Sequence, residues 1–189
     1  MKLLYLLSFL SITLNATISL PENFESDFNQ TIINPKGKTL LYQGHVRYQH
    51  EKEILIDDAN REETIESHLF RWDYTSPTKK EVCTDGVQLI VLDHDLEQVS
   101  RYLISEGINL EEILKVAKQL SSRDYKATYK EVEYLITLDK NEKLQKIFYV
   151  DRLDNRVKIE FTQMKYNLKE FDLHQLECTA PTSYDTIEG

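Results

Sequence analysis

Histidines and carboxylates are the side chains of this chain that could catalyse a reaction or bind a metal. The five histidines form neither an HExxH motif nor another recognised ligand spacing, and the chain has no GxSxG, P-loop or GxGxxG motif. An isolated histidine is most often a surface residue or a partner to a neighbouring strand. The pattern therefore favours structural roles over catalysis or metal binding for all five. They are His45, His50, His68, His94 and His174.

Acidic residues offer another possibility, the pair of carboxylates that hydrolyses a glycosidic bond. Asp73 and Asp93 could form such a pair. Nothing in the sequence brings them together, however, and aspartates are usually solvated. Since no catalytic triad is recognisable either, the sequence favours a binding protein without a cofactor over an enzyme.

Cys83 and Cys178 are the only cysteines, and neither belongs to a CxxC motif or a Cys/His cluster. A metal site built from this pair alone is therefore not expected. In an oxidising compartment they could form one disulfide that closes a long loop. The sequence leaves open whether they do so or remain separate thiols, because it does not give the distance between them.

The N-terminal segment has the three-part organisation of a secretory signal. Lys2 precedes an apolar run over residues 3–14, and Ala16 stands just before the expected cut. The run is shorter than the roughly 20 residues of a membrane-spanning helix, which favours a cleaved signal over a retained anchor. We therefore expect a signal over residues 1–16 and a single exported domain over residues 17–189.

The composition limits the partners of the mature chain. The sequence has 23 basic and 32 acidic residues, which gives a net charge of -9. The field of such a chain repels phosphate, so nucleic acid and anionic membrane surfaces are not expected partners. A hydrophobic fraction of 41% is enough for a core, and the few glycines and prolines argue against disorder.

The stretch LFRWDYTSP places three aromatic side chains at alternate positions. In an extended strand Phe70, Trp72 and Tyr74 share one face, while Arg71 and Asp73 share the other. The aromatic face could be part of an ordinary core or the wall of a ligand cavity.

The stretch QLIVLD is apolar on both faces, which indicates burial on both sides or one face turned to a cavity. We expect its Ile90 and Leu92 to face such a cavity.

Nine to eleven short strands are expected along the chain, mostly joined by tight turns. Residues 79–93 read as two strands connected at Asp85-Gly86, and further turns are expected at residues 139–143 and 151–156. Regularly spaced strands predict an antiparallel meander, and the inherent twist of such a sheet makes it curl. The acidic stretch from Glu51 to Glu66 is expected to be a solvated insertion, in which residues 54–56 could pair as an edge strand.

Two amphipathic segments are predicted to be helices that cover the concave side of the sheet. In the first, Phe24, Phe28 and Ile32 recur at a spacing of four. The second is predicted from Leu110 to Leu120, after Asn109 as its N-cap. Its apolar face comprises Leu110, Ile113, Leu114, Ala117 and Leu120.

The order of several motifs resembles the LolA family of outer-membrane lipoprotein carrier proteins. The family has an F-x-x-x-F-x-Q start, a P-x-x-F-R-W strand, a D-G hairpin and a D-x-x-x-x-Q segment. The matching residues are Phe24, Phe28 and Gln30, then Leu69 to Trp72, then Asp85-Gly86, then Asp93 with Gln98. The resemblance covers the chain from Phe24 to Tyr102. Beyond the predicted helix from Leu110 to Leu120 only the strand pattern agrees.

The resemblance implies a mainly β fold, in which one curved antiparallel sheet forms an incomplete barrel with a helical lid over an apolar cavity. It also implies a monomeric periplasmic chaperone for triacylated lipoproteins. Members of the family take their cargo from an inner-membrane ABC release complex and pass it to an outer-membrane receptor. The residues expected to contact lipid are Phe70, Trp72, Tyr74, Ile90 and Leu92 on strands, and Phe24, Phe28, Leu110, Ile113 and Leu114 on the lid.

The chain departs from the family pattern in two places. Many members carry an arginine just before the P-x-x-F strand, thought to tie the sheet to the lid. Here Ser67 replaces the proline, and Glu66 or His50 stands at the arginine position, depending on where the alignment is gapped. The acidic stretch is also unusual for the family. An alternative interpretation is a periplasmic module of the same fold that senses lipid or polypeptide.

Overall fold

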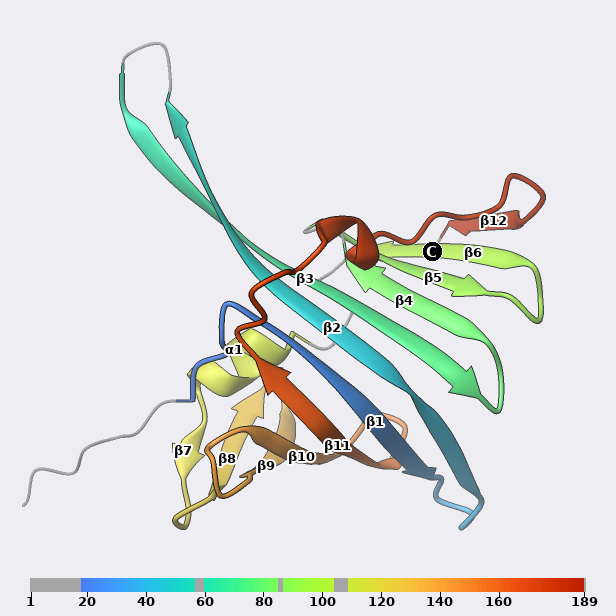
Figure 1. Ribbon diagram of the computed structural model, residues 1–189. Coiled ribbons are helices and arrows are strands. Elements are labelled where there is room, and N and C mark those ends of the chain that lie inside the picture. Colours follow the sequence, from blue (N-terminus) through green and yellow to red (C-terminus); the bar gives the residue numbers. More distant parts are fainter. Residues whose placement is uncertain (1–17, 57–59, 85–86, 104–108, 189) are drawn as a thin grey trace, which may run out of the picture.

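One open, strongly bent sheet of twelve strands makes up most of the structure (Figure 1). The computed structural model describes residues 18–56, 60–84, 87–103 and 109–188. The predicted signal segment and the Asp85-Gly86 turn lie outside the described residues. The strands are β1 (Asn23–Ile33), β2 (Thr39–Ile56), β3 (Glu62–Ser76), β4 (Lys80–Thr84), β5 (Gln88–Asp93), β6 (Gln98–Leu103), β7 (Lys118–Gln119), β8 (Asp124–Tyr129), β9 (Val132–Leu138), β10 (Leu144–Val150), β11 (Arg156–Tyr166) and β12 (Asp185–Glu188).

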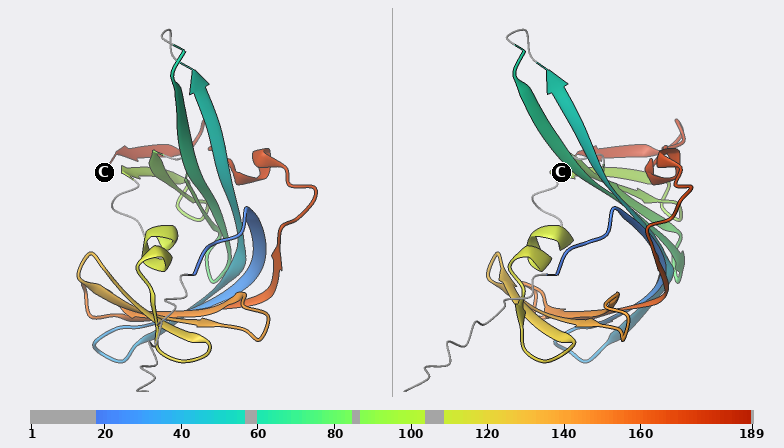
Figure 2. Two further views of the ribbon diagram at one scale, coloured as in Figure 1. Left: turned by 90° about the vertical axis from the view of Figure 1, so that its left-hand side faces the viewer. Right: turned by 60° about the vertical axis from the view of Figure 1, so that its left-hand side comes forward.

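The strand order explains how the chain closes around a hollow. The order is β12-β6-β5-β4-β3-β2-β1-β11-β10-β9-β8-β7, and only the β12–β6 pair is parallel. The chain therefore passes from β6, near one edge of the sheet, to β7 at the other edge. It makes this crossing through α1 (Leu110–Lys115), which consequently lies on the concave side of the sheet (Figure 2).

The first predicted helix is wrong, because Phe24 and Phe28 lie on β1. This strand pairs antiparallel with both β2 and β11, and both phenylalanines are buried. Residues four apart share one face of a strand as well as one face of a helix. The spacing of four therefore could not distinguish the two structures.

The second predicted helix is confirmed but is shorter than expected. Asn109 caps α1, and its Oδ1 accepts a hydrogen bond from the Glu112 backbone N–H at 3.1 Å. The helix ends at Lys115, with Val116 as its C-cap, instead of at Leu120. A cover of two amphipathic helices is therefore wrong for the described part of the chain. No helix in that part is long and apolar enough to cross a membrane.

The acidic stretch continues β2 and β3 as one long hairpin instead of forming a separate insertion. We call residues 51–56 and 62–66 the hairpin arm, which projects beyond the rest of the sheet (Figure 1). Pairing runs without a shift from Gly44 opposite Tyr74 to Ile56 opposite Glu62, so residues 54–56 pair within the hairpin. The arm is solvated as predicted, and Ile54 is 62% exposed.

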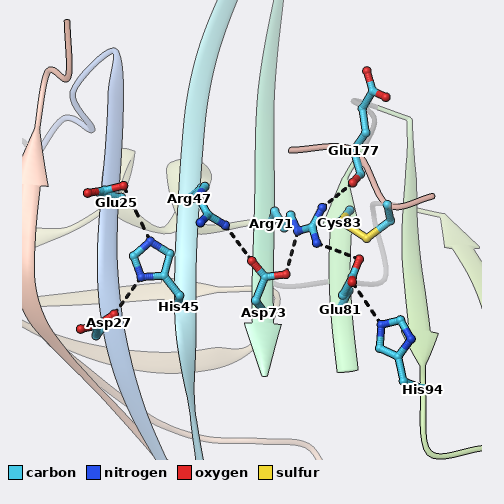
Figure 3. A network of polar contacts seen from close by, with 11 residues as sticks. Glu25, Asp27, His45, Arg47, Arg71, Asp73, Glu81, Cys83, His94 and Glu177 are labelled. Carbon is cyan, nitrogen blue, oxygen red and sulfur yellow. Dashed lines mark hydrogen bonds and ion pairs between the residues drawn. A yellow bond between two sulfur atoms is a disulfide. The ribbon is translucent and has the colours of Figure 1, made fainter. Parts of the chain in front are cut away.

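The convex face is polar and is partly covered by the C-terminal segment. Arg71 donates hydrogen bonds to Asp73 and to the backbone carbonyl of Glu177, and Arg47 donates to the same aspartate (Figure 3). The 3-10 helix η2 (Leu173–Leu176) lies there, followed by a disulfide between Cys83 and Cys178. Of the two arrangements that the sequence left open for the cysteines, the structure therefore has the disulfide.

Gly44 allows the aromatic core to pack tightly against the sheet. It lies opposite Phe28 on β1 and next to an irregularity in the pairing of β2 with β3. A Cβ atom at this position would overlap the Asp73 carbonyl oxygen and approach two carbons of the Phe28 ring at 2.8 Å. Glycine leaves the space in which that ring contacts Trp72 and Tyr74, with centroids 5.0 and 5.1 Å apart.

We predict that Gly44→Ala lowers the free energy of unfolding by about 2 kcal/mol or more, because overpacking forces the ring or the backbone to move. Gly37→Ala is the matched control. Its Cβ would meet nothing within 4 Å, although its φ of +80° carries a smaller strain. Urea unfolding followed by tryptophan fluorescence measures both changes. Equal losses in the two variants would contradict the packing role of Gly44.

Candidate functional site

The concave face of β1, β2 and β3 carries rows of aromatic side chains. The register places Phe24 opposite Tyr48 and Tyr48 opposite Phe70, so three rings cross the three strands. The Tyr48 and Phe70 ring centroids are 4.6 Å apart. The predicted alternation of LFRWDYTSP is thus confirmed, with its aromatic side on the concave face and Arg71 with Asp73 on the convex face.

An apolar cavity of about 260 Å³ lies between this aromatic face and α1. Leu110 and Ile113 contribute to its wall from the helix, and the strands contribute the rest. The residues that line it are Gln30, Phe70, Trp72, Tyr74, Val82, Thr84, Leu89, Leu110, Ile113, Ile147, Tyr149 and Ile159.

Five of the ten residues predicted to contact lipid line this cavity: Phe70, Trp72, Tyr74, Leu110 and Ile113. Three others, Phe24, Phe28 and Leu114, are buried in the adjoining core. The two phenylalanines support the wall, because Phe24 packs edge-on against Phe70 at 6.3 Å and Phe28 packs against Trp72.

The expectation that Ile90 and Leu92 face the cavity is wrong. Val82 and Leu89 line the cavity, so the odd-numbered residues of β5 point to the concave side. Ile90 lies instead on the convex side, near Leu176 and Cys83. Leu92 shares its face and is fully buried. Because this strand is apolar on both faces, the sequence did not reveal which face lines the cavity.

The cavity wall is uncharged, because none of the described residues that line it is acidic or basic. Its polar groups are Gln30, Thr84 and two tyrosine hydroxyls. Burial raises the pKa of Tyr74 to about 12 and also raises the pKa of Tyr149. Both phenols therefore remain neutral at physiological pH. Such a wall suits an apolar ligand.

Several lining residues were missed in the sequence, chiefly Ile147, Tyr149 and Ile159 on β10 and β11. Residues 157–161 of β11 alternate apolar and polar side chains, whereas residues 147–150 of β10 are all apolar. Nothing local showed that either strand faces the aromatic strand across a hollow. That relation depends on β11 returning to pair with β1.

The raised pKa of Tyr74 predicts a loss of stability at alkaline pH. The unfolded phenol titrates near pH 10, so above that pH the folded state holds a proton that the unfolded state has released. The contribution of the neutral Tyr74 phenol to the free energy of unfolding is therefore fully present below pH 10. It is lost as the pH rises towards 12. The free energy of unfolding of the wild type should fall between pH 8 and pH 11. In Tyr74→Phe we expect this fall to be about 1 kcal/mol smaller. Tyr102→Phe is the matched control on β6, and equal losses in all three proteins would refute the assignment.

Known proteins similar to this chain share one family name. The family model described as "Outer membrane lipoprotein carrier protein LolA" matches residues 66–172. An outer-membrane lipoprotein carrier protein of Campylobacter jejuni is 31% identical over 188 residues, covering 99% of each chain. One of Helicobacter hepaticus is 27% identical, covering 77% of this chain and 73% of its own.

Among solved structures, a LolA superfamily protein from Nitrosomonas europaea is 10% identical to this chain, with a TM-score of 0.44. The match covers 85% of this chain and 93% of that protein's chain. Together, the family model and the full-length relative from Campylobacter show that this chain belongs to the LolA family.

Proposed function

We propose that this protein is a periplasmic chaperone that binds the acyl chains of lipoproteins and carries them to the outer membrane. The observation that supports this most directly is the uncharged aromatic cavity beneath α1. The names of the relatives support the cargo, since each is an outer-membrane lipoprotein carrier. They also favour a carrier over the alternative of a sensing module. The protein acts by binding and not by catalysis.

The hydrophobic effect supplies the affinity for such a cargo. Each methylene removed from water contributes about 0.8 kcal/mol, so a chain of about 16 carbons represents about 13 kcal/mol. No single hydrogen bond approaches that value. A broad apolar wall is therefore better suited to the cargo than a precise polar site.

The cavity must enlarge to hold several acyl chains. Its volume of about 260 Å³ lies below the range of about 300–1,000 Å³ typical of small-molecule pockets. The element best placed to move is α1, which is one short helix between two connecting segments. Leu110 and Ile113 fill part of the hollow in the empty protein and swing aside when cargo enters.

The contact that α1 must break on opening lies outside the cavity. His68 on β3 pairs with Glu111 on α1, next to His50 and Glu66, the two candidates for the position of the family's latching arginine. We assign the latch between sheet and lid to this pair. The two side chains are only 19% and 14% exposed, so cargo binding must offset the cost of separating them.

Transfer follows differences in affinity, because the carrier itself holds no energy source. The protein receives triacylated lipoproteins from an inner-membrane ABC release complex and passes them to an outer-membrane receptor that binds them more tightly. The N-terminal signal supports export, and the net charge of -9 keeps a loaded carrier soluble.

The test mixes purified protein with a detergent-solubilised lipoprotein and looks for a soluble one-to-one complex by gel filtration. We expect the acylated lipoprotein to bind and its deacylated form not to bind. Equal binding of the two forms, or binding of neither, would refute the proposal.

A charge introduced into the cavity wall by substitution tests whether this surface binds the acyl chains. We expect Phe70→Glu to abolish loading because it opposes acyl burial. Leu89→Glu, on another lining strand, should do the same, so a folding defect in one variant leaves the test intact. Phe148→Glu is the matched control, since its neighbours Ile147 and Tyr149 line the cavity and it points the other way. Normal loading by both wall variants would overturn the assignment.

A further inference from the structure

Two histidines and two glutamates converge where the hairpin arm meets α1, away from the lining of the cavity. His50 on β2 and His68 on β3 lie directly opposite each other, with their rings stacked at 4.5 Å and 11° apart in plane. Glu66 shares their face of the hairpin, and one of its carboxylate oxygens lies 3.4 Å from His50 Nε2. Glu111 approaches from α1 and contacts His68 Nε2.

We propose that His50, Glu66, His68 and Glu111 form a binding site for a divalent transition-metal ion such as Zn²⁺. Imidazole nitrogens and carboxylate oxygens are ligands that zinc prefers, usually four of them in a tetrahedron. One ligand atom from each of His50, Glu66 and His68 already lies within 4.8 Å of the other two. Glu111 lies outside this group of three but contacts His68 Nε2, so its carboxylate must rotate to join the other donors around one ion.

The polar groups of the cluster are incompletely satisfied without an ion. His50 Nε2 is buried and has no hydrogen-bond partner among the described residues, because the nearby Glu66 oxygen lies outside bonding geometry. A buried polar atom without a partner costs stability. A metal ion at this position would provide the missing partner.

The Tyr48 hydroxyl can orient one of the histidine ligands. It lies 2.8 Å from His68 Nδ1, so it can hold the ring while Nε2 faces Glu111.

Two lysines compete with a metal ion for the glutamates. Lys52 lies 2.9 Å from Glu66, and Lys115 pairs with Glu111. Both lysines are more than half exposed, and such surface pairs contribute little. They can turn towards solvent when an ion binds.

Other clusters in the described part of the chain do not match this one. His45 and His94 each pair with carboxylates but bring only one imidazole. In the group of Glu81, Cys83 and Cys178, both sulfur atoms form the disulfide, so neither is a thiolate that could bind a metal.

The placement of the ligands gives the site a consequence for the lid. Three ligands belong to the sheet and the fourth belongs to α1, so a bound ion would tie the helix to the sheet. If loading displaces α1, as proposed above, the ion would oppose loading. This consequence rests on the proposed function, whereas the metal site itself does not.

Calorimetric titration of the untagged, chelator-treated mature protein with Zn²⁺ tests the site directly. We expect one ion per chain, and Co²⁺ should give the visible absorption of a tetrahedral complex. His50→Ala and His68→Ala should each weaken binding at least tenfold, and Tyr48→Phe about tenfold. His174→Ala, which removes an exposed histidine, is the matched control and should bind as the wild type does.

Failure of the wild-type protein to bind one ion would overturn the proposal, as would unchanged binding in His50→Ala. Circular dichroism establishes that each variant is folded. If His68→Ala does not fold, His50→Ala decides alone, since its Nε2 makes no hydrogen bond that the fold needs. The titration contains no lipoprotein, so its outcome is independent of the carrier function.

Discussion

A bent sheet must cover the apolar face that it bends around, and here the cover is too small to fill the hollow. The concave side carries the rings of β1, β2 and β3 and the apolar residues of β10 and β11, whereas α1 has only six residues. Of these, Leu110 and Ile113 reach the cavity. Burying the remaining apolar surface would be favourable, at about 25 cal/mol per Å². The affinity for an apolar ligand follows from this shortfall.

Polar contacts hold the convex face of the sheet together. On the convex face, Arg71 joins Asp73, Glu81 and the Glu177 carbonyl, so that β3, β4 and the C-terminal segment are held together. The disulfide reinforces the same region. The concave face, in contrast, holds both the main hydrophobic core and the apolar cavity. The alternation of one strand, LFRWDY, supplies residues to both faces.

The sequence predicted what alternation and turn residues determine, and it missed what depends on register. The aromatic row and the turns at residues 139–143 and 151–156 were predictable, because Asp139 and Asp151 accept backbone hydrogen bonds within their own turns. The β8–β9 turn was not marked, since Lys130 and Glu131 adopt positive φ without glycine. His50 and His68 are eighteen residues apart and meet only because the hairpin pairs them. Such a pair of histidines can be predicted from the sequence once the register between the two strands is known.

The errors have the same origin. A spacing of four is shared by strands and helices, so Phe24 and Phe28 were assigned to a lid when they belong to the sheet. When a strand is apolar on both faces, its sequence does not indicate which face is concave. Ile90 was therefore predicted to face the cavity, whereas Leu89 lines it. In both cases the side chains were correctly identified as apolar and buried or half-buried. Long-range pairing decided their roles.

Trp72 allows the most direct test, because it is the only tryptophan of the chain and it lines the cavity. The measurement compares its fluorescence in complexes with a lipoprotein that carries either brominated or unmodified acyl chains, since bromine quenches tryptophan on close contact. Acyl chains held against the concave wall predict strong quenching by the brominated cargo alone. A complex that forms equally well with both cargoes and shows equal fluorescence would contradict the account.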